Sequence, residues 1–298
     1  MLGILYSVLS ALTFSMNMAL VRRGVTTATP GQAALVTVVF GVPLFLVAAA
    51  ATGQLLQWDS IDAGGYWLLA VAGVIHFVIG RYGNYRGLRA IGANRMQVMQ
   101  TLSIPITIIV AMWWLDEEVT GLMWTGIVLI MVGPLIMTQR HGPQAPKNAG
   151  GFTPKMAEGF FWGLVASFGY GASPLLVRAA LEGNNLGIYG GFVSYAAAAV
   201  VLIAYTLIAP GKRAEARAID RGALRLFMTG TVSVFLAQLF RYMALGIAPV
   251  SLVTPLMRTG SLFTLGLSWG MNRSMESFTL PVLTGVALSI AGAVLLAL

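Results

Sequence analysis

The sequence predicts an all-α membrane protein whose ten transmembrane helices form two inverted five-helix repeats. Three observations support this fold class. The chain is 57% hydrophobic and only 9% charged, whereas a soluble domain carries about 25% charged residues. Apolar stretches of the roughly 20 residues that a spanning helix needs recur along the chain. The two halves of the chain also resemble each other in the order of their residues.

The apolar stretches favour helices over a membrane β-barrel, because a barrel shows shorter segments in which polar and apolar residues alternate. They are continuous and rich in Gly, Ala and Leu. The expected spans are residues 3–21, 31–51, 65–88, 94–114, 120–138, 157–177, 187–209, 222–246, 251–271 and 278–298.

The longest connection, residues 139–156, is rich in Pro and Gly and falls at mid-chain, which is typical of a linker. It divides the chain into a first repeat at 1–138 and a second at 157–298. Each predicted repeat has five spans, an odd number, so the second must enter the membrane in the opposite direction. Inverted repeats of this kind are typical of secondary transporters, whose substrate site lies near the membrane midplane between the repeats.

The repeat can be followed residue by residue. A shift of 156 places Arg22 on Arg178, and after a three-residue insertion a shift of 159 places Glu117 on Glu276. The same shifts match Gly3 with Gly159, Ile91 with Ile247, Trp113 with Trp269, Thr120 with Thr279, Gly126 with Gly285 and Gly133 with Gly292. The common order of these matches indicates a duplication.

The distribution of positive charge predicts the orientation. We name the side reached after spans 1, 3, 5, 7 and 9 side A, and the opposite side, which holds both termini, side B. Side B has one cation, Arg178, whereas side A has fourteen. Those fourteen are Arg22, Arg23, Arg86, Arg89, Arg95, Arg140, Lys147, Lys155, Lys212, Arg213, Arg217, Arg221, Arg225 and Arg273. Because cytoplasmic loops carry the excess of Lys and Arg, we expect an inner-membrane protein with side A in the cytoplasm and both termini in the periplasm.

Three arginines lie inside apolar spans, and they indicate a cavity for a negatively charged group. Arg81, Arg241 and Arg258 have no acidic residue at similar depth. An arginine at the bilayer centre costs at least about 2.5–3.5 kcal/mol, so it usually faces a protein interior or a watery path. The alternative is that these arginines extend to the interface or cap carbonyl groups of broken helices.

Polar neighbours of these arginines are further candidates for contact with a substrate. Gln238 and Tyr242 share one helix face with Arg241, and Thr254 shares one with Arg258. His76 lies one turn before Arg81 in the same span. The alternative is that His76 only forms a hydrogen bond with a neighbouring helix.

The stretch from Tyr85 to Arg95, followed by Pro105 and the sequence Trp-Trp-Leu-Asp-Glu-Glu at 113–118, resembles the drug/metabolite transporter superfamily of the EamA type. The second half repeats the pattern at 244–249 and at Glu276. The resemblance covers the whole chain. It implies a carrier of small molecules with a central cavity lined by spans 1, 3, 4, 6, 8 and 9.

The resemblance places one face of span 1 and the matching face of span 6 on that cavity. The polar residues expected there are Thr13 and Asn17 in span 1, and Tyr170 and Ser173 in span 6. Hydrogen bonding between helices is the alternative role for such residues. On span 4, Gln97, Gln100 and Thr101 are further candidates.

These observations favour a secondary transporter that moves a small organic anion or zwitterionic metabolite across the inner membrane by alternating access. The alternative is an exporter of amino acids or other amphipathic metabolites, with structural arginines and selectivity set by Tyr82, Tyr170 and Tyr242. The expected partners are the substrate and membrane lipids, with no nucleic acid, and the oligomeric state stays open. The chain has no cysteine and only two distant histidines, so no catalytic residue, metal site or cofactor is expected.

The repeat also predicts two gates. Arg22 and Glu276 both fall at side A, and their repeat counterparts Arg178 and Glu117 both fall at side B. We expect each pair to close one mouth of the transporter. The alternative is that each charge only anchors a helix end at the membrane interface.

Overall fold

The computed structural model describes residues 1–115, 120–138, 153–248 and 250–297, and the regular elements in these ranges are all helical. The first half contains α1 (Leu2–Gly24), α2 (Pro30–Val39), α3 (Gly41–Ala51), η1 (Gln54–Ser60), α4 (Ala63–Gly73), η2 (Val74–Gly80), α5 (Arg81–Ile91), α6 (Ala93–Thr101), α7 (Ser103–Leu115) and α8 (Gly121–Thr138). The second half contains α9 (Met156–Ala180), α10 (Gly187–Ile208), α11 (Lys212–Arg217), α12 (Arg221–Ile247), α13 (Val250–Met257), α14 (Gly260–Met271), η3 (Arg273–Met275) and α15 (Leu280–Ala297).

Six helical stretches in the described ranges are long and apolar enough to cross a membrane: 2–24, 30–51, 63–91, 156–180, 187–208 and 221–247. Shorter apolar helices cover 124–133 and 280–295. A multi-pass membrane protein is therefore confirmed, while the count of ten spans stays a prediction. The expected spans 94–114 and 251–271 are not among the six, and each of them contains two helices.

Two breaks within predicted spans follow from proline. The expected spans 31–51 and 94–114 each contain two helices, because α2 ends at Val39 and α6 ends at Thr101. Each of these residues lies four positions before a proline, Pro43 or Pro105. A proline has no N–H to donate to the carbonyl four residues earlier, so the helix ends there and a new one begins.

The third break interrupts 251–271 at Arg258 and Thr259, between α13 and α14. Here Thr259 N donates to Leu256 O and Ser261 N donates to Arg258 O, at 3.1 Å each, which replaces helical bonding by tighter three-residue turns. Under the shift of 156, Arg258 corresponds to Leu102, the residue between α6 and α7. Both halves are thus interrupted at the same point.

The expected span 65–88 also departs from a regular α-helix. Residues 74–80 form the π-helical segment η2, which contains His76. A wider turn of this kind often occurs at functional sites. Gly80 and Gly169 let η2 and α9 approach closely, because a Cβ on Gly169 would lie 2.7 Å from Ile75 O.

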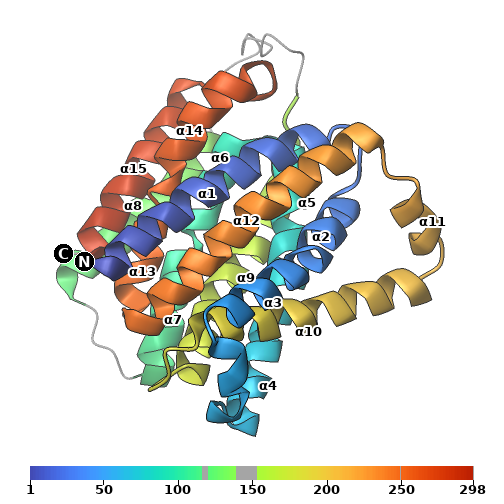
Figure 1. The fold of residues 1–298 in the computed structure, drawn as a ribbon. Helices are drawn as coiled ribbons and strands as arrows, with labels where there is room; N and C mark the ends of the chain where they lie inside the picture. The colour runs from blue at the N-terminus through green and yellow to red at the C-terminus, as the bar shows by residue number, and fades with distance from the viewer. Residues whose placement is uncertain (116–119, 139–152, 249, 298) are drawn as a thin grey trace.

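Long helices of the two halves lie side by side in the bundle. Figure 1 shows α1 running along α12, and both views show α8 beside α15. Arg22, near the end of α1, donates to Arg89 O at 3.4 Å, and Lys155 N, just before α9, donates to Ala90 O at 2.9 Å. Since α1 ends and α9 begins beside the same end of α5, the first helices of the two halves run in opposite directions.

The interior contains two apolar clusters and a set of buried polar groups. One cluster contains Phe45, Phe77 and Tyr195, and the other contains Met18 and Phe227. Buried polar groups of η2, α5, α6, α9 and α12 are joined by hydrogen bonds. In a membrane such groups are costly unless they are hydrogen-bonded to each other or serve a function.

Candidate functional site

A central cavity is lined by several of the polar residues in the interior of the bundle. Its volume is about 30 Å³, which holds about two water molecules. A metabolite would therefore need the surrounding helices to separate. The lining residues are Ala11, Phe14, His76, Gln97, Gln100, Tyr170, Pro174, Gln238, Arg241, Thr254, Met257 and Arg258.

Arg241 connects α12 to α9 at this cavity. Its Nη1 donates to Gln238 Oε1 at 3.1 Å, and its Nη2 donates to Ser173 Oγ at 3.2 Å. Ser173 Oγ is also 2.6 Å from His76 Nδ1, and the His76 ring lies 4.5 Å from the ring of Tyr170. Arg241 is only 3% exposed, so a positive charge is held among neutral partners.

Arg258 reaches the same cavity from the break between α13 and α14. Its Nη1 donates weakly to Gln100 Oε1 at 3.5 Å, and Gln100 Nε2 donates to Asn84 Oδ1 at 2.6 Å. Arg258 Nε and Gln97 Oε1 are buried without a hydrogen-bond partner among the described residues. A guanidinium has five N–H donors, so Arg258 keeps donors for a further acceptor.

The described residues that line this cavity include no carboxylate. Of the described acidic residues, Glu276 pairs with Arg22 and Glu158 pairs with Arg86. Two guanidinium groups therefore share a small volume with only hydroxyl, amide and imidazole neighbours. Such an arrangement attracts a negatively charged group.

A buried ion pair lies where α1 ends. Arg22 Nε is 3.0 Å from Glu276 Oε1, and the two side chains are 3% and 1% exposed. Glu276 also accepts hydrogen bonds from Ala93 N at 2.7 Å and Asn94 N at 3.1 Å, at the start of α6. Burial raises the pKa of the Glu276 carboxyl, and Arg22 opposes this shift. The predicted contact between Arg22 and Glu276 is thus present in the structure.

The counterpart at the other end of the bundle differs. Arg178 Nη1 donates to Leu245 O at 3.1 Å and to Gly246 O at 3.5 Å, at the end of α12. Glu117, its predicted partner, lies outside the described residues. The second predicted pair therefore stays a prediction.

Comparison with protein families identifies the chain. The model of the EamA-like transporter family matches residues 1–139 and 157–298. The chain belongs to the EamA-like transporter family. The expected resemblance is confirmed, and this EamA protein is a membrane transporter. A comparison with curated protein sequences finds no match.

Solved structures share the fold of this EamA protein. One of them, described only as "Crystal structure of protein", has a TM-score of 0.67 and 14% sequence identity. The match covers 98% of this chain and 94% of that one. At this identity the likeness shows the fold alone.

Nine predicted candidates of this EamA protein meet around the central cavity. Eight of them line it: His76, Gln97, Gln100, Tyr170, Gln238, Arg241, Thr254 and Arg258. The ninth, Ser173, bonds both His76 and Arg241. They come from η2, α6, α9, α12, α13 and the α13–α14 break.

Arg81 lies outside the lining of the cavity. Its Nη2 donates to Tyr195 Oη at 2.7 Å, and its guanidinium carbon lies 4.7 Å from the centre of the Phe77 ring. Tyr195 belongs to α10, a helix that contributes no residue to the lining of the central cavity. A role for Arg81 in substrate binding stays a prediction.

Three other predicted residues also lie outside the lining. Thr13 Oγ1 donates to Leu9 O in its own helix at 2.7 Å. Asn17 bridges α12 and α5, because its Nδ2 donates to Gly230 O at 3.0 Å and its Oδ1 accepts from Tyr85 Oη at 3.3 Å. Tyr242 packs in an apolar cluster with Phe45. The structure gives each of them a partner elsewhere.

Sequence analysis did not single out the apolar part of the lining, Phe14 and Met257. Nothing in the sequence distinguishes these residues from lipid-facing ones in the same helices. The candidates Gln97 and Gln100 of α6 do line the cavity, whereas Thr101 lies 3.3 Å from Ser289 of α15.

Proposed function

We propose that this EamA transporter moves a small organic anion or zwitterionic metabolite by alternating access. The observation that carries the proposal is the pair of guanidinium groups, Arg241 and Arg258, on one central cavity that has no described carboxylate. A guanidinium fork makes two parallel hydrogen bonds to a carboxylate, phosphate or sulfonate. The substrate's acidic group would replace the weak 3.5 Å contact of Arg258 with Gln100.

The remaining lining suits the rest of a metabolite. Gln97, Gln238 and Thr254 offer amide and hydroxyl groups, while Phe14 and Tyr170 offer aromatic surface. A zwitterion would place its acidic group at the arginines and its polar or apolar end at these side chains. Specificity between anions then depends on few contacts, as is usual in small-molecule sites.

Alternating access is supported by the interrupted helices. The breaks at Leu102 and at Arg258 occupy matching positions in the two halves, and interrupted helices at matching positions mark the binding sites of many transporters built from repeats. The volume of the cavity, about 30 Å³, is too small for a metabolite. We propose that separation of the repeats widens it toward one side at a time.

The ion pair of Arg22 and Glu276 is proposed as the closed side-A gate. It ties the end of α1 to η3 and to the start of α6, three segments distant in sequence. Arg178 and Glu117 are proposed as the side-B gate. When one pair is intact, the other is broken.

The proposed location is the inner membrane, with both termini in the periplasm, and it rests on fourteen side-A cations against one. A C-terminal alkaline phosphatase fusion should then be active, and a C-terminal green fluorescent fusion should be dark. The reverse result would place side A outside.

The second candidate function, export of amino acids or other amphipathic metabolites, is favoured by one observation. Arg241 already has partners in Gln238 and Ser173, as a structural arginine would. Of the three tyrosines expected to set selectivity, Tyr170 is among the described residues that line the central cavity. Tyr82 lines a different pocket, and Tyr242 packs in the apolar core.

A transport experiment separates the two functions. Protein reconstituted in liposomes preloaded with a mixture of dicarboxylates, phosphate esters, sulfonates and neutral amino acids is tested for exchange against each labelled compound, with amines that have no acidic group in parallel. The proposal expects exchange of at least one anionic or zwitterionic class, competed by others of that class and lost in Arg241→Ala and Arg258→Ala. Exchange that is confined to compounds without an acidic group, or that both variants retain, would contradict it.

A further inference from the structure

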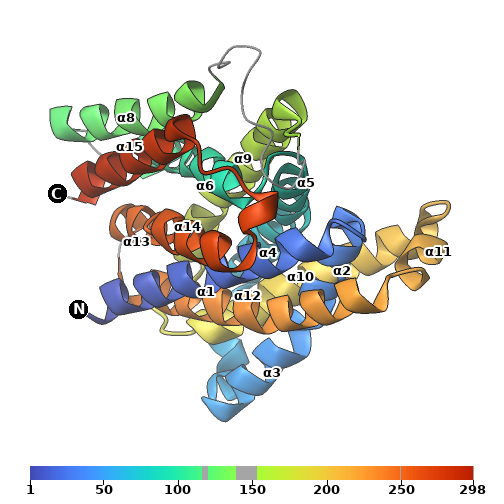
Figure 2. The same ribbon diagram turned by 90° about the horizontal axis from the view of Figure 1, so that it is seen from above.

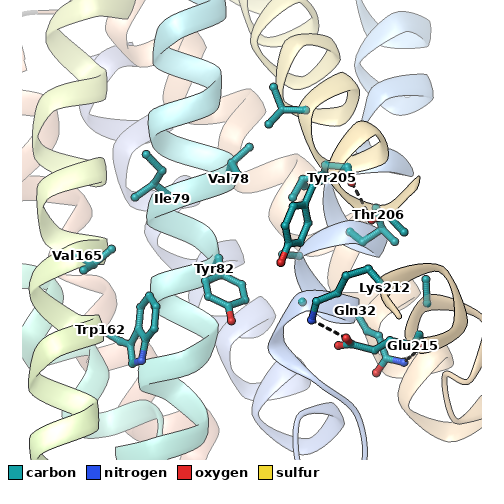
Figure 3. Close-up of a pocket in the computed structure, with 16 residues that line it drawn as sticks. Gln32, Val78, Ile79, Tyr82, Trp162, Val165, Tyr205, Thr206, Lys212 and Glu215 are labelled. Atoms are coloured by element: carbon teal, nitrogen blue, oxygen red, sulfur yellow. Dashed lines mark hydrogen bonds and ion pairs between the residues drawn. The ribbon is translucent and has the colours of Figure 1, made fainter. Parts of the chain in front are cut away.

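A second cavity lies to the side of the bundle, separate from the central one. Its volume is about 400 Å³, within the range of small-molecule sites. Figure 3 shows it between α9 and η2–α5 on one side and α10 with α11 on the other. None of its lining residues belongs to the central cavity.

The walls of this side pocket are apolar and open toward the lipid. Leu35, Val78, Val165 and Leu202 form much of the surface. Ile79 at its edge is 45% exposed although it lies within a membrane-spanning stretch. An acyl chain can therefore enter between η2 and α10 without leaving the hydrocarbon.

The opposite end of the pocket is polar. Lys212 Nζ lies 2.6 Å from Glu215 Oε2, and Glu215 Oε1 accepts from Thr29 Oγ1 at 2.6 Å. The hydrogen bond between Lys212 and Glu215 raises the pKa of Lys212 and lowers the pKa of Glu215. Both side chains therefore stay charged at neutral pH. In Figure 3 the hydroxyl groups of Tyr82 and Tyr205 lie toward this end.

The segments at the polar end carry a net positive charge. Arg86 donates to Tyr82 Oη at 3.3 Å, lies over the Trp162 ring at 5.0 Å and pairs with Glu158. Besides Lys212 and Glu215, the short helix α11 carries Arg213 and Arg217, which are exposed. Together, α11 and the Arg86–Glu158 pair have four cations and two carboxylates, which gives a charge of +2.

We propose that the side pocket binds one anionic phospholipid of the side-A leaflet, with an acyl chain between η2 and α10 and its headgroup beside Lys212. A phospholipid in that leaflet has the same polarity as the pocket, because its charged end lies at the surface and its chain points to the midplane. Basic residues next to a membrane attract anionic headgroups. The proposal does not depend on the substrate of the central cavity.

Native mass spectrometry tests the proposal. Purified protein is exchanged into micelles that contain equal amounts of phosphatidylglycerol and phosphatidylcholine of one chain length, and retained lipid is counted. Val201→Trp places an indole in the pocket, while Val200→Trp, at a neighbouring residue that is 67% exposed and does not line it, serves as the matched control. Lys212→Gln tests the headgroup, and Arg225→Gln, an exposed side-A arginine on α12, is its control.

The unmodified protein should retain one phosphatidylglycerol per molecule. Retention should fall at least fivefold in Val201→Trp and stay unchanged in Val200→Trp. Lys212→Gln should reduce the preference for phosphatidylglycerol, whereas Arg225→Gln should not. Equal retention by both tryptophan variants, or equal retention of the two lipids by the unmodified protein, would overturn the proposal. Size-exclusion profiles establish that each variant is folded, and Ile79→Trp replaces Val201→Trp if the latter is not.

Discussion

The two ends of the bundle carry the same arginine contact but complete it differently. At side A, Arg22 Nη1 donates to Arg89 O, and at side B, Arg178 Nη1 donates to Leu245 O. Leu245 is the repeat counterpart of Arg89. Only the first arginine has an ion pair among the described residues, with Glu276. The duplication thus supplies the backbone contact twice, and Glu276 adds a buried ion pair to the side-A copy.

The backbone differs at the same two places. Gly92, beside the side-A pair, has φ 86° and ψ 170°, a conformation that is open essentially to glycine alone. A Cβ on Gly92 would also lie 2.7 Å from Glu276 Oε2. Its repeat counterpart is Ala248, whose φ of −140° and ψ of 150° are ordinary extended values. The close approach of the carboxylate to α6 therefore requires glycine at side A, whereas the backbone of Ala248 at side B has no such requirement.

The largest loss of folding stability is expected from Glu276→Gln, because this change leaves the buried Arg22 without its counter-charge. Removing one partner of a buried ion pair costs about 3–5 kcal/mol. The expected result is a clear drop in the thermal unfolding midpoint in detergent. Glu158→Gln, in a pair that is about one-third exposed, is the control and should change the midpoint little. An equal drop in both variants would show that the buried side-A pair stabilises the protein no more than the partly exposed pair does.

A smaller loss of folding stability is expected from Gly92→Ala. Forcing a side chain into this conformation costs about 1–3 kcal/mol, and the added Cβ displaces Glu276 from α6. Ala248→Gly at the equivalent place should cost less, since its backbone needs no special residue. Thermal unfolding of the pair of variants measures the difference, and an equal loss in both would contradict the asymmetry of the two ends.

The smallest effect concerns the proposed side-B gate. Arg178→Glu should slow transport, and adding Glu117→Arg should restore part of the rate. An exposed ion pair contributes about 0–1 kcal/mol, which shifts a balanced two-state equilibrium by up to about fivefold. Exchange rates in liposomes provide the measurement. If the double variant is folded and transports no better than Arg178→Glu, these charges only anchor helix ends.

The sequence predicted the features that depend on local chemistry. The apolar spans, the repeat and the contact of Arg22 with Glu276 all follow from residue order. The breaks after Val39 and Thr101 were also within reach of sequence analysis, since Pro43 and Pro105 lie four residues further on. The π-helical turn at His76 was not within reach, because no residue of the local sequence marks it, and the close contact of Gly169 with Ile75 O joins residues far apart in the chain.

The three intramembrane arginines show where sequence reasoning stops. Their local sequences look alike, yet Arg241 and Arg258 line the central cavity while Arg81 contacts Tyr195 and Phe77. The difference arises from which neighbour each helix face meets. Tyr195 lies 114 residues from Arg81 in the chain, so no spacing rule connects them.

The most direct test of the central claim is anion binding by the two cavity arginines. Thermal-shift titrations with the anionic compound that exchanges best in liposomes are carried out on the unmodified protein, Arg241→Ala, Arg258→Ala and Arg225→Ala. Arg225 is an exposed arginine on the same helix as Arg241 and serves as the control. The account predicts that the ligand-induced shift is retained in Arg225→Ala and lost in both cavity variants, with all four proteins folded. A full shift in Arg241→Ala and Arg258→Ala would contradict it.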